Sequence, residues 1–369
     1  MSSRIRDLQA ALADTDIDLF VINPGSTLRY LTDHRFESHE RLFLLLIPRE
    51  GDPTAVVPQL ENDNWRHAVP EVEAVHLWDD ADGPVAAADA AFAPFRNARK
   101  VAVESLDCRF LEMQHLGAQL PDAEVVSGDA VVGTLRLYKS AEEADNMRRA
   151  ARIAEETLEA VMSTVRVGDR EKTIAGALAA GLLQRGGEGI SFPIIALSGP
   201  KSALPHGIPD EREVRAGELL LIDFGTSFNG YHSDITRTFA VGERPSDAIV
   251  DVYEAVRDAN ARGRAAARPG VTSHDVHTAC QVELETERWA DFATHRTGHG
   301  LGLEIHEPPS IMRGDQTVLR PGMTFTVEPG LYKDGFTGVR IEDDLWVTED
   351  GAESLTVFPR ELRILGADS

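Results

Sequence analysis

The sequence predicts an α/β (α+β) protein built from two domains, residues 1–130 and residues 131–369. The chain has 369 residues, which is too long for one ordinary domain, and its hydrophobic fraction of 42% suffices for sizeable cores. In the first 130 residues, short apolar runs alternate with helical patterns, as expected for an α/β domain with a mixed sheet. The remainder begins with two helical patterns and ends, over residues 291–359, mainly in strands and loops.

The charge balance limits the classes of partner. Asp and Glu number 61 against 37 Lys and Arg, which gives a net charge of −24. Such a negative field argues against nucleic acid and against anionic membranes. Only five of the 37 basic residues are lysines, and an acidic, lysine-poor surface suits a halophilic protein in a salt-rich cytoplasm. A GC-rich genome, which favours arginine codons, is the alternative explanation.

Three further observations indicate a cytoplasmic protein. The longest apolar runs, such as residues 42–47, are far too short to span a bilayer. The N-terminus has the pattern of an amphipathic helix and no apolar signal-peptide core. The two cysteines, Cys108 and Cys280, make neither a disulfide framework nor a zinc ribbon.

The first domain is expected to begin with an amphipathic helix, because Ile5, Leu8 and Leu12 lie on one helical face. Further helices are predicted at residues 60–67, 81–92 and 109–119. Strands are predicted at residues 19–22, 41–48, 54–57, 72–77 and 101–104. The domain has no phosphate-binding loop, nucleophile elbow or metal-spaced cluster. We therefore expect it to provide oligomer contacts and to cover the neighbouring domain's site.

The second domain is expected to open with a long helix. Ser140 and Glu143 form the sequence signature of a capping box, and the helical pattern extends to about Thr164. Asp169 is expected to cap the next helix. The remaining elements are predicted in the order helix 170–184, strand 191–197, Gly/Pro loop 198–210 with His206, hairpin 219–239, a helix capped by Ser246 and running to about Ala267, and helix 273–289.

The hairpin organises the second domain. Asn229-Gly230 supplies the two positive-φ residues that a type I′ turn requires. Pairing about this turn places Asp223 opposite Thr236, and Asp234 then lies on the same face as Asp223. The two carboxylates become diagonal neighbours, with backbones roughly 7–8 Å apart. A metal ion or a metal pair fits between them, whereas without a cation they would repel each other and be costly to bury.

Three later segments carry residues that could complete such a site. His299 lies among glycines that allow close approach of the backbone. Glu328 lies on the polar face of an alternating segment, and Glu342 shares a polar face with Arg340. Taken singly, each residue has a purely structural explanation. Asp223 could be a turn residue at the end of a strand, His299 could be a packed loop histidine, and Arg340 with Glu342 could be a cross-strand charge pair.

Together the motifs occur in the order IDFG, SDITRT, GHGLGLEIHEPP, TVEPG and VRIED. This order resembles the pita-bread metallopeptidases, which include Xaa-Pro dipeptidase (prolidase), Xaa-Pro aminopeptidase and methionine aminopeptidase. The resemblance covers about residues 135–360, and residues 1–130 look like the creatinase/prolidase N-terminal domain. It implies a pita-bread catalytic domain, a duplicated αβ fold with a curved antiparallel sheet.

The resemblance also implies a role for each candidate residue. Two divalent ions would be held by Asp223, Asp234, His299, Glu328 and Glu342. Glu328 would also act as general base, His206 would hydrogen-bond the substrate, and His306 would help to stabilise the tetrahedral intermediate. His295 and Arg340 would line the prolyl or carboxylate side, or Arg340 would orient a ligand carboxylate. Independently, four carboxylates and one imidazole suit Mn²⁺, with Co²⁺ or Zn²⁺ as alternatives, in a two-metal site.

We therefore expect metal-dependent hydrolysis of X–Pro bonds in proline-containing dipeptides or short peptides by a homodimeric Xaa-Pro dipeptidase. Xaa-Pro aminopeptidase is the alternative, since the same motifs fit it, but the compact chain favours the dipeptidase. The long N-terminal domain counts against methionine aminopeptidase. The intact ligand set counts against creatinase and against a peptide-binding module without activity. The polar loop with His34 and His39 is expected to be solvated; in dimers of the family, however, the matching region can approach the partner's active site.

Overall fold

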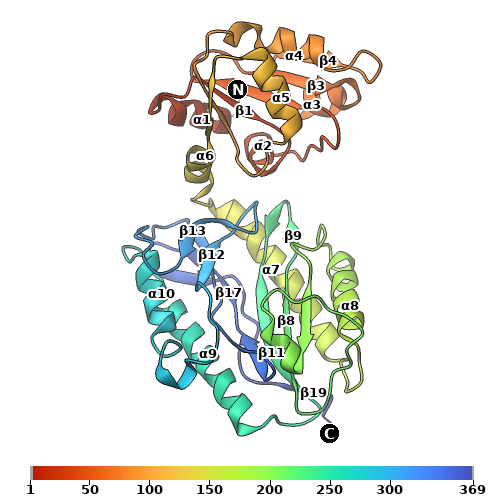
Figure 1. Cartoon of the computed structure of the whole chain (residues 1–369), viewed down its shortest axis with the longest axis vertical. Coiled ribbons are helices and arrows are strands. Elements are labelled where there is room, and N and C mark those ends of the chain that lie inside the picture. Colours follow the sequence, from red (N-terminus) through yellow and green to blue (C-terminus); the bar gives the residue numbers. More distant parts are fainter. Residues whose placement is uncertain (1–2, 368–369) are drawn as a thin grey trace. The chain divides into compact units, whose positions relative to one another are not determined.

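The computed structural model describes residues 3–367, which form two compact units. The first unit ends at Arg136 and the second begins at Leu137. Figure 1 shows the first in red to yellow and the second in yellow-green to blue. Among the described residues, no helix is long and apolar enough to cross a membrane.

The first unit is built on a six-stranded sheet with the order β4-β3-β2-β1-β5-β6. Its strands are β1 (Leu19–Ile22), β2 (Leu44–Pro48), β3 (Thr54–Pro58), β4 (Ala74–Trp78), β5 (Lys100–Val103) and β6 (Glu124–Ser127). Its helices are α1 (Ser3–Ala13), α2 (Ser26–Thr32), α3 (Asn62–Ala68), α4 (Val85–Phe92), α5 (Phe110–Gln119) and α6 (Asp129–Arg136), with short 3₁₀ turns η1 (Gln59–Glu61) and η2 (Ala93–Phe95). Strand β1 pairs antiparallel with β2 and parallel with β5.

Helices cover both faces of this sheet because the side chains of β1 alternate between two cores. Phe20 and Ile22 face one core with residues of α1, α2, α3 and α6, whereas Leu19 and Val21 face the other with residues of α4 and α5. The predicted mixed-sheet α/β domain is therefore confirmed. The sequence did not indicate α2, β6 or α6, because each is too short for a clear apolar period.

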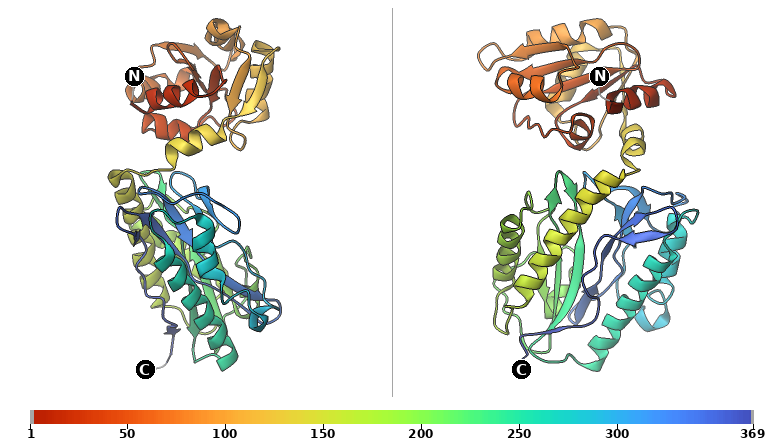
Figure 2. Two further views of the ribbon diagram at one scale, coloured as in Figure 1. Left: turned by 90° about the vertical axis from the view of Figure 1, so that its left-hand side faces the viewer. Right: turned by 180° about the vertical axis from the view of Figure 1, so that it is seen from behind.

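The second unit repeats one arrangement, a helix pair followed by a sheet. In the first half, α7 (Ala141–Met162) and α8 (Glu171–Gln184) pack on the sheet β19-β11-β8-β7. In the second half, α9 (Asp247–Ala266) and α10 (Ser273–Gln281) pack on the sheet β13-β12-β14-β17-β18. Figure 2 shows both halves of the unit from two further sides. This repetition matches the duplicated αβ fold that the resemblance implied.

The strands of the second unit are short. The first sheet contains β7 (Ile195–Ser198), β8 (Leu219–Phe224), β11 (Ile235–Val241) and β19 (Ile364–Leu365). The second contains β12 (Gly298–Gly300), β13 (Glu307–Ile311), β14 (Thr324–Val327), β17 (Asp343–Val347) and β18 (Ala352–Ser354). Two-stranded ladders join β9 (Ser227–Phe228) to β10 (Tyr231–His232) and β15 (Gly330–Lys333) to β16 (Thr337–Arg340). The 3₁₀ turns are η3 (Gly199–Ala203) and η4 (Glu287–Trp289).

The central hairpin has the predicted turn and register. Asn229 and Gly230 have φ values of 49° and 82°, as a type I′ turn requires. Strands β8 and β11 pair antiparallel with Thr236 opposite Asp223. The returning strand is not continuous, because Asp234 lies between β10 and β11. The hairpin therefore places both aspartates near the end of the ladder, where their side chains are available to a site.

Three details of the helix predictions are wrong. Ser246 occupies the N-cap position of α9, but its side chain accepts no capping hydrogen bond. Asp169 does not cap α8, because its carboxylate accepts a hydrogen bond from the backbone N–H of Arg166 at 2.8 Å. The helix predicted over residues 273–289 ends at Gln281. Beyond that point the chain turns, and Leu284 and Trp289 both reach the hydrophobic core from separate turns.

Candidate metal centre

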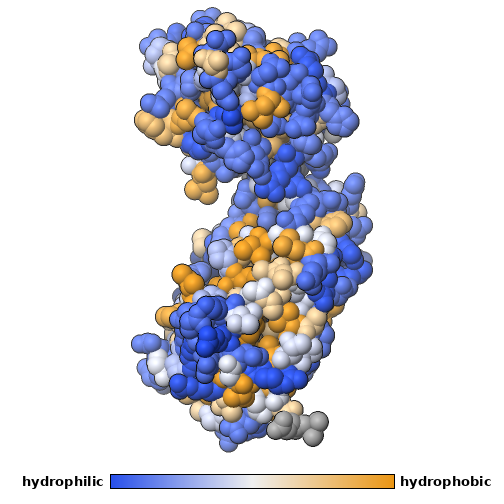
Figure 3. Space-filling view, turned by 90° about the vertical axis from the view of Figure 1, so that its right-hand side faces the viewer, coloured by the Kyte–Doolittle hydropathy of each residue, from blue (hydrophilic) through white to orange (hydrophobic). Residues whose placement is uncertain are grey.

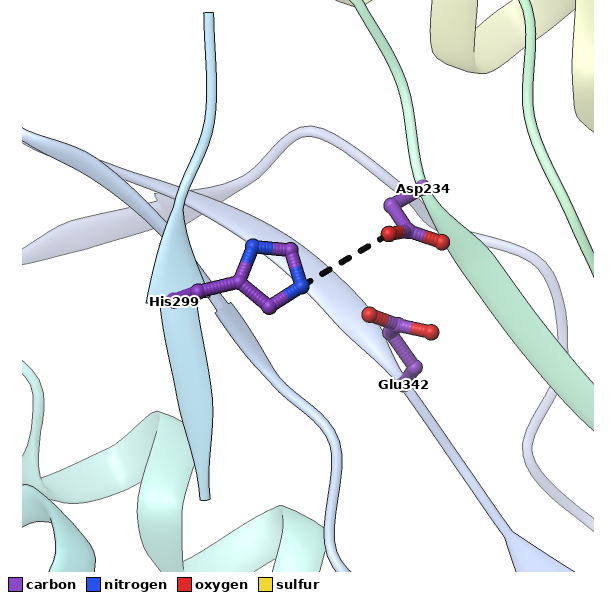
Figure 4. Close-up of side chains that lie close together, drawn as sticks. All are labelled: Asp234, His299 and Glu342. Atoms are coloured by element: carbon purple, nitrogen blue, oxygen red, sulfur yellow. Dashed lines mark ion pairs between the residues drawn. The ribbon is translucent and has the colours of Figure 1, made fainter. Parts of the chain in front are cut away.

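The five candidate ligands lie on or beside interior strands of both sheets. Asp223 belongs to β8 and His299 to β12, whereas Asp234, Glu328 and Glu342 lie immediately beside strands. Four of them are buried and Glu328 is half-buried. Ligand atoms of Asp234, His299 and Glu342 all lie within 4.8 Å of one another, so these three could hold an ion. In Figure 4 the imidazole of His299 points toward both carboxylates.

His299 presents a free nitrogen to this cluster. Its Nδ1 donates a hydrogen bond to the carbonyl of Gly300 at 3.1 Å, so Nε2 carries the lone pair. Nε2 lies 3.4 Å from a Glu328 oxygen and 3.8 Å from an Asp234 oxygen. Burial, followed by the neighbouring His306, lowers the pKa of His299 to about 3. The imidazole is therefore neutral at ordinary pH, which is the form that binds metals.

Glycine is required on both sides of His299 because the neighbouring strands approach closely. A Cβ on Gly298 would lie 1.9 Å from the carbonyl oxygen of Thr326, and one on Gly300 would lie 2.2 Å from that of Pro308. Such distances are impossible for any other residue without a shift of backbone. The two glycines thus let β12, which carries His299, fit between β13 and β14.

The carboxylates are crowded and incompletely paired. Asp223, Asp234 and Glu342 each have one buried carboxylate oxygen without a hydrogen-bond partner. Burial, together with the charge of the neighbouring carboxylates, raises the pKa of Asp234 and Glu342 well above their ordinary values. Burial raises the pKa of Glu328 to about 7, although the positive charge of Arg340 opposes this. Divalent cations would pair the orphaned oxygens and offset the repulsion, so the donor set fits them.

A second layer of hydrogen bonds fixes the carboxylates. The hydroxyl of Thr236 donates to Glu342 at 2.6 Å. The backbone N–H of Asp234 donates to the buried carboxylate of Asp344 at 3.0 Å. The first contact orients the carboxylate of Glu342, and the second holds the backbone of Asp234.

The cluster opens into a cavity of about 700 Å³, which is within the usual range for small-molecule sites. The cavity is lined by all nine residues that the sequence suggested for the site: His206, Asp223, Asp234, His295, His299, His306, Glu328, Arg340 and Glu342. The ring of His306 lies edge-on to that of His299, with centroids 4.2 Å apart. Burial, followed by the positive charge of Arg296, lowers the pKa of His306, so this imidazole is neutral as well.

Comparison with known proteins gives the family. Residues 145–349 match the model described as Metallopeptidase family M24, and residues 4–138 match the Creatinase/Prolidase N-terminal domain. The chain belongs to metallopeptidase family M24. The predicted pita-bread family is confirmed, and the cluster described above is its candidate catalytic centre.

The similarity of this M24 metallopeptidase to its relatives extends along nearly the whole chain. It is 36% identical over 361 residues to the probable dipeptidase PepE of Mycobacterium tuberculosis, covering 96% of this chain and 94% of that protein. It is 33% identical over 360 residues to the Xaa-Pro dipeptidase of Lactobacillus helveticus, covering 97% and 98%. The structure of a prolidase from Thermococcus sibiricus matches with a TM-score of 0.92 and 30% identity, covering 99% of this chain and 100% of that one.

Arg340 of the M24 metallopeptidase lines the cavity, but its guanidinium is bonded to protein groups. It is 3% exposed and forms an ion pair with Asp223 through one terminal nitrogen. The other terminal nitrogen donates to the hydroxyl of Tyr332 at 2.7 Å, and Nε donates to Thr236 at 3.1 Å. Its guanidinium thus bonds the carboxylate of one candidate ligand, Asp223.

His295 ends the same chain of hydrogen bonds. Its Nδ1 donates to the carbonyl of Arg296 at 2.7 Å, so its Nε2 accepts from the hydroxyl of Tyr332 at 2.9 Å. Burial, followed by the charge of Arg340, lowers the pKa of His295 to about 4. The imidazole is thus neutral and both of its nitrogens are occupied.

Three residues near the site were missed from the sequence. Tyr332 bridges Arg340 and His295, Asp344 fixes Asp234, and Arg296 lines the cavity. For two of them, the only indication in the sequence was their position next to a motif. Arg296 precedes the glycine segment of His299, and Asp344 follows Glu342 by two residues. Tyr332 gave no signal, because an aromatic residue in a strand is usually part of a core.

Proposed function

We propose that this M24 metallopeptidase is an Xaa-Pro dipeptidase that depends on two divalent metal ions. The proposal is carried by the convergence of the five candidate ligands, His206 and His306 on one cavity of about 700 Å³. Relatives that match almost the whole chain are named Xaa-Pro dipeptidase or probable dipeptidase, which supports the same substrate class.

The proposed metal ligands are Asp223, Asp234, His299, Glu328 and Glu342. Orphaned buried oxygens and a neutral imidazole nitrogen fit cations at this place. Mn²⁺ is the proposed metal because the donor set is mostly hard oxygen, with Co²⁺ and Zn²⁺ as alternatives. When bound, the ions would polarise the scissile carbonyl and lower the pKa of a water molecule.

Glu328 is proposed as the general base. It is the half-buried member of the ligand set and lines the cavity, so it is the carboxylate best placed to take a proton from water. The hydroxyl of Thr326 donates a hydrogen bond of 3.4 Å to the Glu328 oxygen that also faces His299. This contact limits the rotation of the carboxylate.

His206 and His306 are proposed to bind the substrate and to donate hydrogen bonds to its carbonyl oxygen as negative charge develops. Both line the cavity, and His306 is next to His299. Arg340 is proposed to position Asp223, since its guanidinium nitrogens already bond Asp223, Tyr332 and Thr236. The same reasoning makes His295 a support for Tyr332 rather than a partner of the substrate.

The test compares three substrates with the Mn²⁺-loaded enzyme: an Xaa-Pro dipeptide, its C-terminal amide and an Xaa-Pro tripeptide. The free dipeptide should have the highest kcat/KM, and chelation should abolish its cleavage. Equal cleavage of the tripeptide would assign an Xaa-Pro aminopeptidase instead. Failure to cleave any of the three would refute the peptidase proposal.

We also propose a homodimer in a salt-rich cytoplasm, with the N-terminal domain, residues 1–130, supplying contacts between copies. The net charge of −24 and the scarcity of lysine support the halophilic part of this proposal. Hydrophilic side chains dominate the face of the first unit seen in Figure 3. The resemblance to dimeric prolidases supports the dimer, and light scattering at high and low salt tests it.

A further inference from the structure

Arg296 is a charged side chain of the cavity that the proposed mechanism does not use. It lines the main cavity of about 700 Å³ and also an adjoining cavity of about 410 Å³. His299 and His306 line both cavities as well. Arg296 is exposed, and among residues 3–367 no hydrogen bond or ion pair involves its guanidinium. Its charge is therefore available to a ligand at the mouth of the site.

The backbone that carries Arg296 is fixed although its side chain is not. The carbonyl of Arg296 accepts a hydrogen bond from His295. The next residue, Thr297, donates its N–H to the carbonyl of Ile311 at 2.9 Å and accepts from the N–H of Glu328 at 2.7 Å. Because this backbone is fixed by hydrogen bonds, the side chain of Arg296 can rotate to contact a ligand without displacing the catalytic groups.

The other basic groups of the cavity are not suited to hold an anion. Arg340 is buried and bonded to Asp223, and both nitrogens of His295 are occupied. Burial lowers the pKa of His306, whereas a guanidinium is charged throughout. Four carboxylates line the same cavity, and two divalent ions would neutralise them without leaving positive charge for a substrate.

We infer that Arg296 binds the free carboxylate of the dipeptide and thereby selects dipeptides over longer or amidated peptides. The inference rests on the proposed dipeptidase function and names the group that determines its substrate length. A guanidinium matches a carboxylate with two parallel hydrogen bonds, which an amide or an extended chain cannot accept in the same way. Arg296 acts in substrate binding and takes no part in bond cleavage.

The test measures kcat and KM of the Mn²⁺-loaded enzyme for an Xaa-Pro dipeptide and for its amide. Arg296→Gln should lower kcat/KM for the free dipeptide by about 10–100-fold, mainly through KM, because a hydrogen bond to a charged group is lost. Cleavage of the amide should change by less than about twofold. Arg296→Lys should keep part of the preference, since a point charge remains.

Arg320→Gln is the matched control, because Arg320 is another exposed arginine of the same unit that lies outside both cavities. It should leave both substrates unaffected. Metal content and circular dichroism establish that each variant is folded and loaded.

Two results would overturn the inference while leaving the dipeptidase function intact. One is an unchanged preference for the free dipeptide in Arg296→Gln. The other is an equal loss of kcat on both substrates, which would place Arg296 in transition-state stabilisation. If the unmodified enzyme does not cleave the dipeptide, the proposed function fails first and the inference fails with it.

Discussion

Glu342 and Asp343 are adjacent buried acids with opposite surroundings. Asp343 receives hydrogen bonds from Arg237, Arg360 and Asn260, so both of its carboxylate oxygens are paired with protein donors. Although burial would raise its pKa, the charge of Arg237 and the bond from Arg360 hold the pKa below its ordinary value. Glu342 has a raised pKa, because it is buried beside Glu328 and Asp223, and it retains an orphaned oxygen.

The difference separates a structural carboxylate from a functional one. The arginine-compensated cluster around Asp343 ties the C-terminal segment at Arg360 to α9 and to the hairpin. Around Glu342, burial and the charges of Glu328 and Asp223 outweigh the opposing charge of Arg340, so the pKa of Glu342 stays raised. One residue along the chain thus separates a group that the fold needs from a group that the metal site needs.

The largest effect is expected for Glu342→Gln, which removes the charge and keeps the shape. Metal affinity and kcat/KM should both fall by more than about 100-fold, the usual limit for residues that only support a ligand. The metal-free variant should melt no lower than the metal-free parent, because a repelled buried charge is gone. Metal analysis, kinetics and calorimetry measure the three quantities. If Glu342→Gln kept both metal and activity, Glu342 would not differ in function from the structural carboxylate of Asp343.

Asp343→Asn should act on stability instead. It leaves Arg237, whose side chain is 1% exposed, without a buried counter-charge. We expect a loss of about 3–5 kcal/mol in the free energy of unfolding, measured by urea denaturation.

Asp247→Asn is the control for this variant, because it breaks an exposed pair with Arg244 whose side chains are 61% and 87% exposed. Such pairs contribute about 0–1 kcal/mol. If Asp343→Asn were as mild as this control, the arginine cluster would not have the structural role assigned to it.

The pH dependence of the metal-free protein sharpens the comparison. The pKa values of Asp234, Glu342 and Glu328 are raised in the folded state, to about 7 for Glu328, so the folded chain binds more protons than the unfolded chain. Stability is therefore fully present below the unfolded pKa values and is lost as pH rises through the folded ones. Between pH 6.5 and 8 it should fall by up to about 1.4 kcal/mol per pH unit for each carboxylate that is still protonated in the folded chain and ionised in the unfolded chain.

The opposing effect of His295 and His299 fades through this window, because their lowered pKa values of about 4 and about 3 favour folding mainly as pH rises toward 6.5. Melting curves with and without Mn²⁺ provide the measurement. Metal-free stability that stays level or increases across this window would show that the cavity carboxylates are compensated after all.

The smallest effect concerns the surface as a whole. A net charge of −24 should make stability rise from low to molar KCl, because screening relieves self-repulsion. The rise should appear equally in Glu342→Gln and in the unmodified chain, since neither buried cluster is reached by screening. A melting temperature that is constant or falls with KCl would contradict the halophilic interpretation.

The sequence predicted the parts of the site that depend on local rules. Asn229-Gly230 fixed the hairpin register and with it the pairing of Asp223 with Thr236. Alternation over residues 323–328 placed Phe325 in the core and Glu328 toward the cavity. Such patterns depend on neighbouring residues, so one chain without relatives is sufficient for them.

Contacts between distant segments could not be predicted in this way. The hydrogen bond from Asp234 to Asp344 joins residues 110 positions apart, and the ion pair of Arg340 with Asp223 joins residues 117 apart. Neither position is marked by a turn or a period. The early end of α10 at Gln281 has the same origin, because the core positions of Leu284 and Trp289 override the helical pattern.

The central claim is that the cavity carboxylates are completed by two metal ions. Titration of the chelated enzyme with Mn²⁺, followed by Xaa-Pro dipeptide cleavage and by metal analysis of the same samples, tests it most directly. We expect no cleavage at the start, a rise in activity with bound metal and a break at two ions per chain. Full activity in the chelated, metal-free protein would contradict the claim.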